Sequence, residues 1–305
     1  MNWLKISELA PLCKWDEPMA RYTSLKVGGK ARGFFSPKSA TDLIDFFKLN
    51  SVQSEPLAFC TLGLGSNLLI RDGGFDGVVI STKAVKSIEK CQGKKPKLWV
   101  DCGTGLAKLA HFGSKMGFDS LNFLVGIPGS LGGALAMNAG CHQMQIWDWV
   151  EQLEWLSSEG EIERLSIEDF EIGYRLARIK KRRQGIFLRA LLRLEKINAQ
   201  DLNYFIQWRA QNQPIDKPNC GSVFKNPKTG FSAGYYIDKA GLKGFRLGKA
   251  EISKKHANFI ITQRETSASE VENLICHIQN EIQNQFGVSL VQELVIAGNP
   301  NGEYI

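Results

Sequence analysis

Short apolar runs separated by polar, glycine-rich turns dominate the first two thirds of the chain. Leu43, Ile44 and Phe47 repeat at helical spacing, and Ser39 is placed to cap a helix predicted over 39–49. A second short helix is predicted over 104–116. Apolar runs of strand length stand at 57–62, at 78–82, at a run ending in 100–102, and at 149–156, 161–166 and 186–194.

The last third ends in the most clearly marked helix. Ser267 and Glu270 fit a capping box, and Gly287 stands where a glycine would end the helix. One apolar face is formed by Val271, Leu274, Ile275, Ile278 and Ile282. Before it, the polar segment 195–220 with its two prolines is predicted to be a domain junction. This alternation of elements predicts an α+β or mixed α/β protein.

Composition narrows the class of protein. The 305 residues are 43% hydrophobic and 23% charged, which is typical of a globular chain rather than a disordered one. No apolar stretch is long enough to cross a membrane, and Met1 to Leu12 do not form a secretory signal. The seven cysteines are odd in number and form no C-x-x-C pair, so reduced thiols and a cytoplasmic location are expected. Since His111, His142 and His277 lack ligand spacing, no metal is expected.

The charge favours anionic partners. Lys plus Arg number 38 and Asp plus Glu 31, so the net charge is 38 − 31 = +7. The densest basic run lies at 178–183, where a solvated face is a commoner explanation than a phosphate-binding stripe. A basic nucleotide- or nucleic-acid-binding protein is one alternative. Against it, aromatic residues are not interleaved with the basic ones as a stacking surface requires.

Many of the 30 glycines gather in two clusters. The first contains Gly63, Gly65, Ser66 and Asn67, but Leu68 occupies the sixth position of a G-x-G-x-x-G fingerprint, so a Rossmann site is excluded. A turn of this composition can present backbone N–H groups to an anion, or it can simply be a tight turn.

The second cluster is GIPGSLGGA, residues 126–134, followed by Asn138 and Gly140. Its small side chains allow a flat cofactor or a diphosphate to approach the backbone. A closely packed helix start is the alternative. Two such clusters in one chain favour the cofactor interpretation for both.

Eight segments match the motifs of one known family in the same order. The first three are YTSLKVGG (22–29), GLGSNLLIRDGGFDGVVI (63–80) and GIPGSLGGALAMNAG (126–140). The others are GYR (173–175), PNCGSVFKNP (218–227), AGLKG (240–244), SKKHANFI (253–260) and FGVSLVQELVIAG (286–298). Together they resemble the UDP-N-acetylenolpyruvoylglucosamine reductase (MurB) family over roughly 20–298, and the modest length resembles its shorter type II subclass.

The resemblance implies a fold class. It is α+β, with a two-part FAD-binding domain of the vanillyl-alcohol-oxidase/PCMH type and a C-terminal α+β substrate-binding domain. The expected spans are 1–82, 83–197 and 198–305. This scaffold would explain why the Rossmann fingerprint is absent.

The resemblance also implies an activity. The family reduces UDP-N-acetylglucosamine enolpyruvate to UDP-N-acetylmuramate for peptidoglycan, with FAD as cofactor and NADPH as co-substrate. The partners are then these two small molecules, with neither nucleic acid nor a membrane span. A cytoplasmic monomer is expected.

The resemblance also assigns roles to individual residues, by their positions in the matching motifs. Ser222 corresponds to the proton donor, Arg175 to the arginine that holds the carboxylate, and Glu293 to a glutamate that acts at the intermediate. Taken singly, these would be interpreted as a turn serine, a strand-edge arginine and an edge-strand glutamate. The FAD positions are Gly63, Gly65, Ser66, Asn67, Gly126, Gly129, Ser130 and Gly132. The substrate positions are Lys225, Asn226, Tyr236 and Lys243.

The chain departs from the family pattern at several places near these motifs, namely Cys141, His142, Ala177, Ile179, Cys220 and Thr262. They affect local packing more than the three catalytic positions. The main alternative within flavoenzymes is an alcohol or sugar oxidase on the same FAD scaffold. Such an enzyme would not need GYR, GSVFKNP and the terminal glutamate in that order.

Overall fold

The computed structural model describes residues 8–181, 184–228 and 230–300, and it divides the chain into two compact units. Unit 1 takes the chain up to Lys14, then Phe34–Leu64 and Val78–Gln207. Unit 2 takes Trp15–Gly33, Gly65–Gly77 and the chain from Trp208 onward. The spans 1–82, 83–197 and 198–305 stay a prediction. Residues 1–7, and Arg182 and Arg183 of the basic run, lie outside the described residues.

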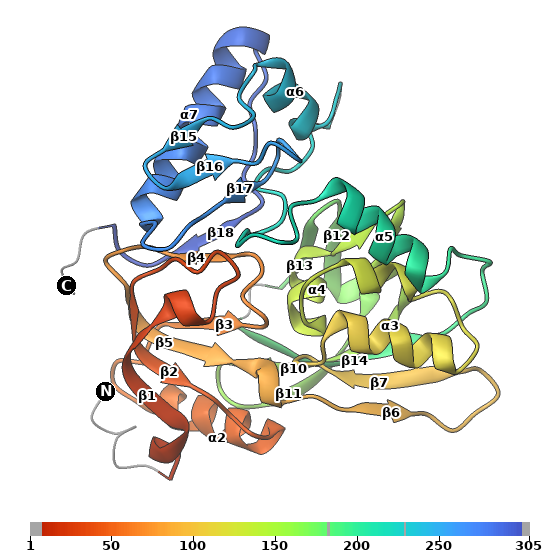
Figure 1. The fold of residues 1–305 in the computed structure, drawn as a ribbon. Coiled ribbons are helices and arrows are strands. Elements are labelled where there is room, and N and C mark those ends of the chain that lie inside the picture. Colours follow the sequence, from red (N-terminus) through yellow and green to blue (C-terminus); the bar gives the residue numbers. More distant parts are fainter. Residues whose placement is uncertain (1–7, 182–183, 229, 301–305) are drawn as a thin grey trace. The chain divides into compact units, whose positions relative to one another are not determined.

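A four-stranded sheet has the order β1-β2-β5-β3 (Figure 1). Its strands are β1 (Cys13–Pro18), β2 (Lys30–Phe35), β3 (Phe59–Leu62) and β5 (Phe75–Ser81). β3 runs parallel to β5, and Phe59 lies opposite Val78. Helix α2 (Ala40–Ser51) begins at the Ser39–Asp42 capping box, which confirms the first predicted helix. The rings of Phe35, Phe46, Phe47 and Phe59 form a chain of contacts, with centroids 5.0–5.4 Å apart, between α2 and this sheet.

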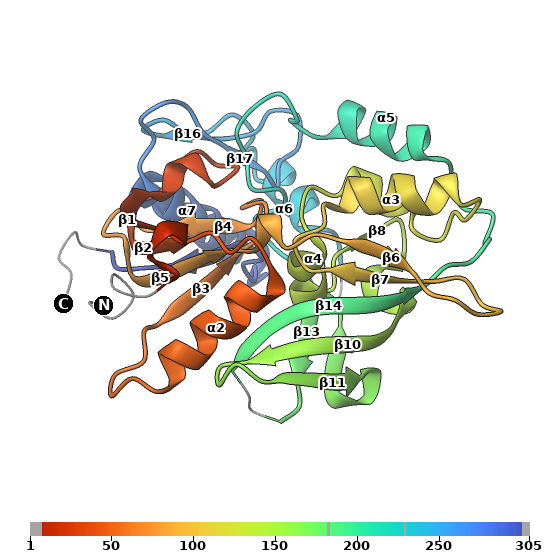
Figure 2. The same cartoon turned by 90° about the horizontal axis from the view of Figure 1, so that it is seen from below.

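Unit 1 contains an antiparallel five-stranded sheet with the order β11-β10-β14-β7-β6 (Figure 2). Its strands are β6 (Ile88–Lys90), β7 (Lys97–Asp101), β10 (Val150–Ser157), β11 (Ile162–Ser166) and β14 (Gly185–Arg193). Their positions agree with the strands predicted at the run ending in 100–102 and at 149–156, 161–166 and 186–194.

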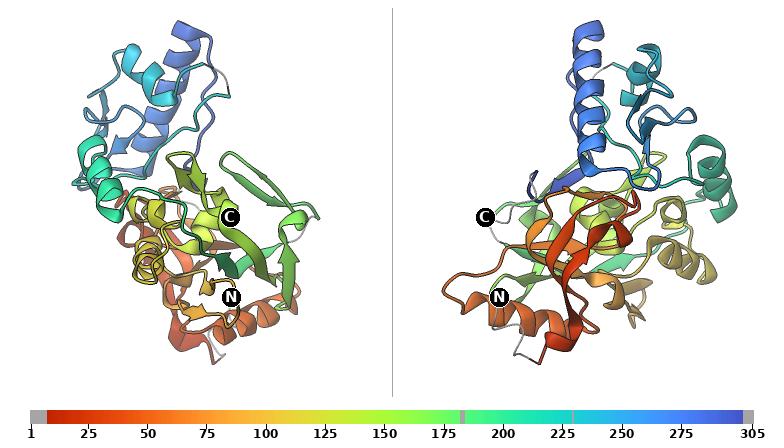
Figure 3. Two further views of the ribbon diagram at one scale, coloured as in Figure 1. Left: turned by 90° about the vertical axis from the view of Figure 1, so that its right-hand side faces the viewer. Right: turned by 60° about the vertical axis from the view of Figure 1, so that its left-hand side comes forward.

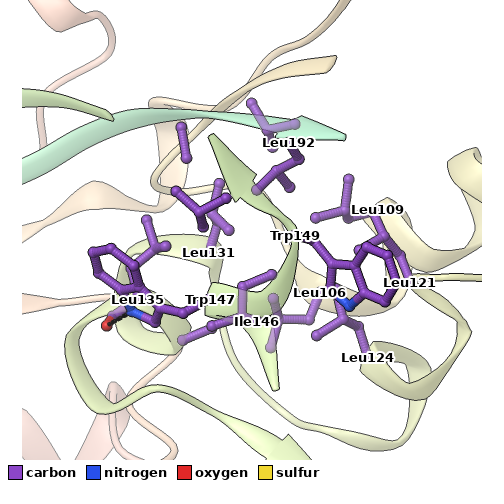
Figure 4. Packing of buried hydrophobic residues seen from close by; sticks show 14 of the residues in the cluster. Leu106, Leu109, Leu121, Leu124, Leu131, Leu135, Ile146, Trp147, Trp149 and Leu192 are labelled. Carbon is purple, nitrogen blue, oxygen red and sulfur yellow. Dashed lines mark hydrogen bonds between the residues drawn. The ribbon is translucent and has the colours of Figure 1, made fainter. Parts of the chain in front are cut away.

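Helices α3 (Leu106–Lys115) and α4 (Leu131–Met137) pack against the five-stranded sheet. The short helix predicted over 104–116 is α3. Leu106, Leu131 and Leu192 belong to the buried core between these elements, together with Trp147 (Figure 4). Each fully buried leucine contributes about 2 kcal/mol of hydrophobic stabilisation. This core gives the second glycine cluster, around α4, a rigid support.

Two short hairpins of unit 1 pack against this core. One joins β8 (Gly140–Cys141) to β9 (Met144–Gln145), and the other joins β12 (Phe170–Gly173) to β13 (Leu176–Ile179). Tyr174 and Arg175 form the two-residue turn of the second hairpin, because Gly173 pairs with Leu176.

Unit 2 is built around α7 (Ala268–Phe286), the blue helix in both views of Figure 3. Helix α6 (Ala233–Lys239) and the sheet of β15 (Arg246–Leu247), β16 (Ala250–Ile252) and β17 (Ile260–Ile261) pack with it. A separate parallel pair joins β4 (Leu68–Ile70) to β18 (Val295–Ala297). The inner face of α7 is the predicted one: Val271, Leu274, Ile275, Ile278 and Ile282 are buried.

Both ends of α7 have the expected caps. Ser267 and Glu270 form the capping box, and Gly287 follows the helix in the left-handed conformation at φ 66°. Asp72, far away in sequence, accepts hydrogen bonds of 2.8 Å from the backbone amides of Ala268 and Ser269. Burial raises the pKa of Asp72, but hydrogen bonds from the Ser269 hydroxyl and these amides outweigh it, so the pKa lies below its ordinary value.

The predicted junction 195–220 contains a helix that the pattern did not reveal, α5 (Leu202–Asn212). Phe205 is its one buried residue, whereas Tyr204, Ile206 and Trp208 are exposed. Across the described part of the chain, no helix combines the length and apolar character that a membrane crossing needs.

Candidate functional site

Within unit 1, Gly63 of the first glycine cluster lies directly against Ser130 of the second. A Cβ atom on Gly63 would lie 2.3 Å from the Ser130 hydroxyl oxygen, so only glycine allows this approach without a shift. Ser130 precedes α4 and is 1% exposed, and its Oγ has no hydrogen-bond partner in the described structure. A buried hydroxyl in that state is a candidate ligand contact.

The other glycines of the second cluster serve packing as well. The Gly132 amide donates to the Cys102 carbonyl at 2.8 Å, and a Cβ there would lie 3.0 Å from the Cys102 Cβ. The Gly129 carbonyl accepts from the Leu106 amide at 3.0 Å, and Gly126 faces Phe205. Gly132 therefore serves close packing at the start of a helix, which was the alternative to cofactor binding. Gly133 and Pro128, by contrast, are exposed.

The rest of the first cluster lies in unit 2 and is tied to two distant segments. Gly65 adopts φ +68°, and its carbonyl accepts from the Ser24 amide at 2.9 Å. The Asn67 side-chain amide donates to the Glu293 carbonyl at 3.1 Å, and the Asn67 carbonyl accepts from Val295. A predicted FAD residue is thus held against the segment of a predicted catalytic residue.

Gly65 and Gly287 make a matched pair for a stability test. Both have positive φ, +68° and +66°, but a Cβ on Gly65 would lie 2.0 Å from the Tyr22 carbonyl oxygen, whereas Gly287 has nothing within 4 Å. We expect Gly287→Ala to lower the free energy of unfolding by about 1 kcal/mol. Gly65→Ala should lower it by about 3 kcal/mol, because the backbone must also shift. Urea denaturation of the FAD-free proteins measures both, and equal losses would contradict the close approach.

Ser222 lies on a segment that is held by hydrogen bonds on both sides within unit 2. The Val223 amide donates to Asn258 at 2.9 Å, and the Val223 carbonyl accepts from the Glu293 amide at 2.7 Å. Just before it, Gly221 has φ +76° and donates to the Asn219 side chain at 2.9 Å. Ser222 and Glu293 are therefore carried by two backbone segments that lie side by side.

The charge of Glu293 acts on the Ser222 segment. Burial raises the pKa of the Cys220 thiol to about 12, and the Glu293 carboxylate adds to the rise. Cys220 is therefore a neutral, buried thiol at physiological pH rather than a nucleophile. His256 also lies in unit 2, and its pKa is lowered by burial and by the nearby Lys243 ammonium group. Its Nδ1 accepts from the Asn258 amide at 3.3 Å, which is a structural role.

Three of the four predicted substrate residues lie on α6 or contact it. Asn226 accepts from the Ala233 amide at 3.1 Å, in the first turn of that helix. The Tyr236 hydroxyl accepts from the Phe231 amide at 3.3 Å, and the Lys243 ammonium pairs with Asp238 at 2.7 Å. Lys225 is half-buried, and its amide donates to the Val291 carbonyl at 2.8 Å, next to the Glu293 segment.

Arg175 occupies the turn of the β12–β13 hairpin in unit 1, with φ +52°. Its Nη1 donates to the Asn138 carbonyl at 3.2 Å and its Nη2 to the Gly140 carbonyl at 2.8 Å. The guanidinium carbon lies 5.1 Å from the centroid of the Tyr174 ring. The nearby Cys141 thiol has its pKa raised to about 11 by burial, and the charge of Arg175 opposes that rise.

Asn138 is a site residue that the sequence reasoning missed. It ends α4 in the left-handed conformation, at φ 47°, and is fully buried. The signal in the sequence was an asparagine directly after a helix, which is typical of a left-handed C-cap. Its contacts with Arg175 become visible only in the structure. Among the residues that the structure describes, no group of His, Cys, Asp and Glu side chains has the arrangement of a metal site.

Two family models match the chain. One, described as an FAD-binding domain, covers residues 31–166, and the other, the C-terminal domain of UDP-N-acetylenolpyruvoylglucosamine reductase, covers 213–297. With the α+β fold and the glycine clusters, the first defines the class of protein: an FAD-dependent oxidoreductase.

Curated relatives match the sequence of this chain over nearly its whole length. A UDP-N-acetylenolpyruvoylglucosamine reductase from Alkalilimnicola ehrlichii is 39% identical over 286 residues, covering 92% of this chain and 93% of the relative. One from Legionella pneumophila strain Paris is 38% identical and covers 99% of both chains. The crystal structure of the reductase from Thermus caldophilus has 29% identity and a TM-score of 0.73, over 93% of this chain and 98% of that one.

This chain belongs to the UDP-N-acetylenolpyruvoylglucosamine reductase (MurB) family. It is a flavoprotein oxidoreductase of peptidoglycan precursor synthesis. The expected α+β fold class, with its FAD-binding domain and C-terminal domain, is confirmed. The family match favours the reductase over the oxidase and the nucleic-acid-binding alternatives. The type II assignment stays a prediction.

Proposed function

We propose that the chain is an NADPH-dependent reductase that converts UDP-N-acetylglucosamine enolpyruvate to UDP-N-acetylmuramate. The observation that carries the proposal is the near full-length likeness to reductases of that name, 99% of both chains for the Legionella pneumophila enzyme. We place the activity in the cytoplasm and assign it to a monomer.

The residues of the glycine clusters fit FAD. Ser130 offers a buried hydroxyl without a protein partner, directly beside the side-chain-free Gly63. The positions assigned to FAD are Gly63, Gly126, Gly129, Ser130 and Gly132 in unit 1, and Gly65, Ser66 and Asn67 in unit 2. Bound FAD would supply the redox chemistry, accepting a hydride from NADPH and delivering it to the enolpyruvyl group.

The chain's own residues would manage the charge and the proton. Hydride addition to the terminal alkene carbon leaves negative charge on the adjacent carbon and its carboxylate. Arg175 is assigned to the carboxylate, since a guanidinium forms two parallel hydrogen bonds to it and stabilises the enolate. Ser222 gives the proton of its hydroxyl to the adjacent carbon, and solvent then replaces that proton.

Glu293 and Lys225 are assigned supporting roles. A serine hydroxyl is a weak acid, so its anion needs stabilisation, which the Lys225 ammonium group and nearby amides would supply. Glu293 would orient groups around the intermediate from the segment that adjoins Ser222. Lys225, Asn226, Tyr236 and Lys243 would bind the sugar nucleotide, whose diphosphate and carboxylate suit a chain of net charge +7.

An anaerobic titration of the FAD-loaded protein tests this function. NADPH should bleach the flavin absorbance, and one equivalent of the enolpyruvyl sugar nucleotide should restore it. An oxidase would instead be bleached by a reduced alcohol or sugar and restored by oxygen. A colourless protein that takes up no FAD would refute the proposal outright.

A further inference from the structure

Residues with a strained, left-handed backbone cluster around Arg175. Among the described residues, eight non-glycine residues have positive φ, and four of them are Asn138, His142, Gln143 and Arg175. These four occupy the end of α4, the β8–β9 turn and the β12–β13 turn. Each left-handed residue costs about 1 kcal/mol, a cost that persists where the surroundings fix the conformation.

Asn138 forms hydrogen bonds both with the backbone of the β12–β13 hairpin and with the side chain of Arg175. Its Nδ2 donates to the Gly173 carbonyl at 2.9 Å, which anchors the backbone two residues before Arg175. Its own carbonyl accepts from Arg175 Nη1 at 3.2 Å, which anchors the guanidinium. With the Gly140 carbonyl on Nη2, the plane of the guanidinium is fixed by two acceptors of the same loop.

The orientation of the Asn138 amide follows from its partners. Asp148 accepts from Gln145 Nε2 at 3.1 Å, so Gln145 turns its Oε1 toward Asn138. Asn138 Nδ2 then donates to that oxygen at 2.8 Å as well as to Gly173. Both partners are acceptors, so the NH2 group must face them, and Asn138 Oδ1 is left buried without a partner in the described structure. A carboxylate at this place would set an anion against two carbonyl oxygens.

We propose that Asn138 is the positioning residue of Arg175. It fixes the hairpin turn and the guanidinium together, so that the cation is preorganised for the substrate carboxylate rather than ordered during the reaction. This inference rests on the proposed function, because it assumes that Arg175 acts in the enolpyruvyl step.

Asn138→Asp is the sharpest test. Aspartate has the same size and tolerates the left-handed backbone, but it lacks both N–H donors. We expect reoxidation of the reduced flavin by the enolpyruvyl substrate to slow by at least about tenfold, since a misplacement of about 1 Å can cost on the order of 100-fold. Flavin reduction by NADPH should stay within about twofold. Acidification should restore part of the lost rate, because a protonated carboxyl regains one donor.

Asn138→Gly gives a second variant should the aspartate fail to fold. Glycine keeps the left-handed backbone and the carbonyl that accepts from Arg175, and it removes only the tie to Gly173 and Gln145. The same selective slowing is expected. In crystals of the FAD-free variant, the Arg175 turn should be displaced from its place in the wild-type protein.

Asn122→Asp is the matched control. Asn122 is also buried in unit 1, its Nδ2 donates to the Gln200 carbonyl at 3.1 Å, and its Oδ1 likewise has no partner in the described structure. This hydrogen bond does not involve Arg175. The melting temperature of Asn122→Asp should fall as that of Asn138→Asp does. Both flavin half-reactions of this control should keep their wild-type rates.

The outcomes distinguish a failure of the positioning role of Asn138 from a failure of the role assigned to Arg175. If Arg175→Ala slows the enolpyruvyl step while both Asn138 variants keep it, the positioning role is refuted and the proposed function stands. If Arg175→Ala itself keeps the step, the assigned role of Arg175 fails. If Asn138→Asp slows both half-reactions equally, Asn138 is a structural residue only, and the inference is overturned.

Discussion

Ser222→Ala is expected to abolish reduction of the enolpyruvyl group while leaving flavin reduction by NADPH intact. The hydroxyl is assigned to proton donation, and loss of a positioned general acid costs about 10²–10⁴-fold. Flavin reduction needs no proton from Ser222, so bleaching by NADPH should keep its rate. Stopped-flow absorbance of the flavin, first with NADPH and then with the enolpyruvyl sugar nucleotide, resolves the two steps.

A serine elsewhere in unit 2 controls for the substitution itself. Ser289 is exposed between α7 and β18, and Ser289→Ala should change neither half-reaction. The hydrogen bonds that hold the Ser222 segment come from the backbone of Val223 and Glu293, so the alanine variant should also fold normally. Unchanged turnover in Ser222→Ala would rule out its assignment as the proton donor.

Arg175→Ala should have the second largest effect. Removing a preorganised charge partner of a developing anion costs about 10²–10³-fold, and the loss should fall on the enolpyruvyl step. Arg175→Lys should recover little, because an ammonium group is a point charge without the two parallel donors. The rate of flavin reoxidation measures both variants.

Arg178 provides the control on the same hairpin. It pairs with Glu171 at 2.5 Å, and its side chain is 70% exposed, so the pair contributes little to stability. Arg178→Ala should keep the wild-type rate of reoxidation. A loss in Arg178→Ala as large as that in Arg175→Ala would mean that the basic hairpin acts as a whole, not through one guanidinium.

Local patterns predicted the regular elements well where the caps and the apolar face agree. Ser267, Glu270 and Gly287 bound α7 as expected, and Ser39 begins α2. Helix α5 escaped prediction because its apolar residues do not follow one face: Phe205 is buried while Tyr204 and Ile206 are exposed. Amphipathic spacing carries no signal for such a helix.

The candidate site was predictable only through its residue types. The glycine clusters indicated an anionic cofactor, but the contact of Gly63 with Ser130 joins residues 67 positions apart. In the same way, the bond from Arg175 to the Asn138 carbonyl spans 37 positions and depends on two left-handed residues. No local propensity encodes such pairs, since packing of the whole unit decides them.

Unit 2 is formed by three separate stretches of the chain, and this affects its folding during synthesis. β4 pairs with β18 at Leu68 and Val295, and Asp72 caps α7 at Ala268, so these bonds cannot form until almost the entire chain has left the ribosome. Contacts this distant in sequence are slow to form. A chain that stops before Val295 therefore lacks the partner of β4 and leaves that strand as an open edge prone to aggregation.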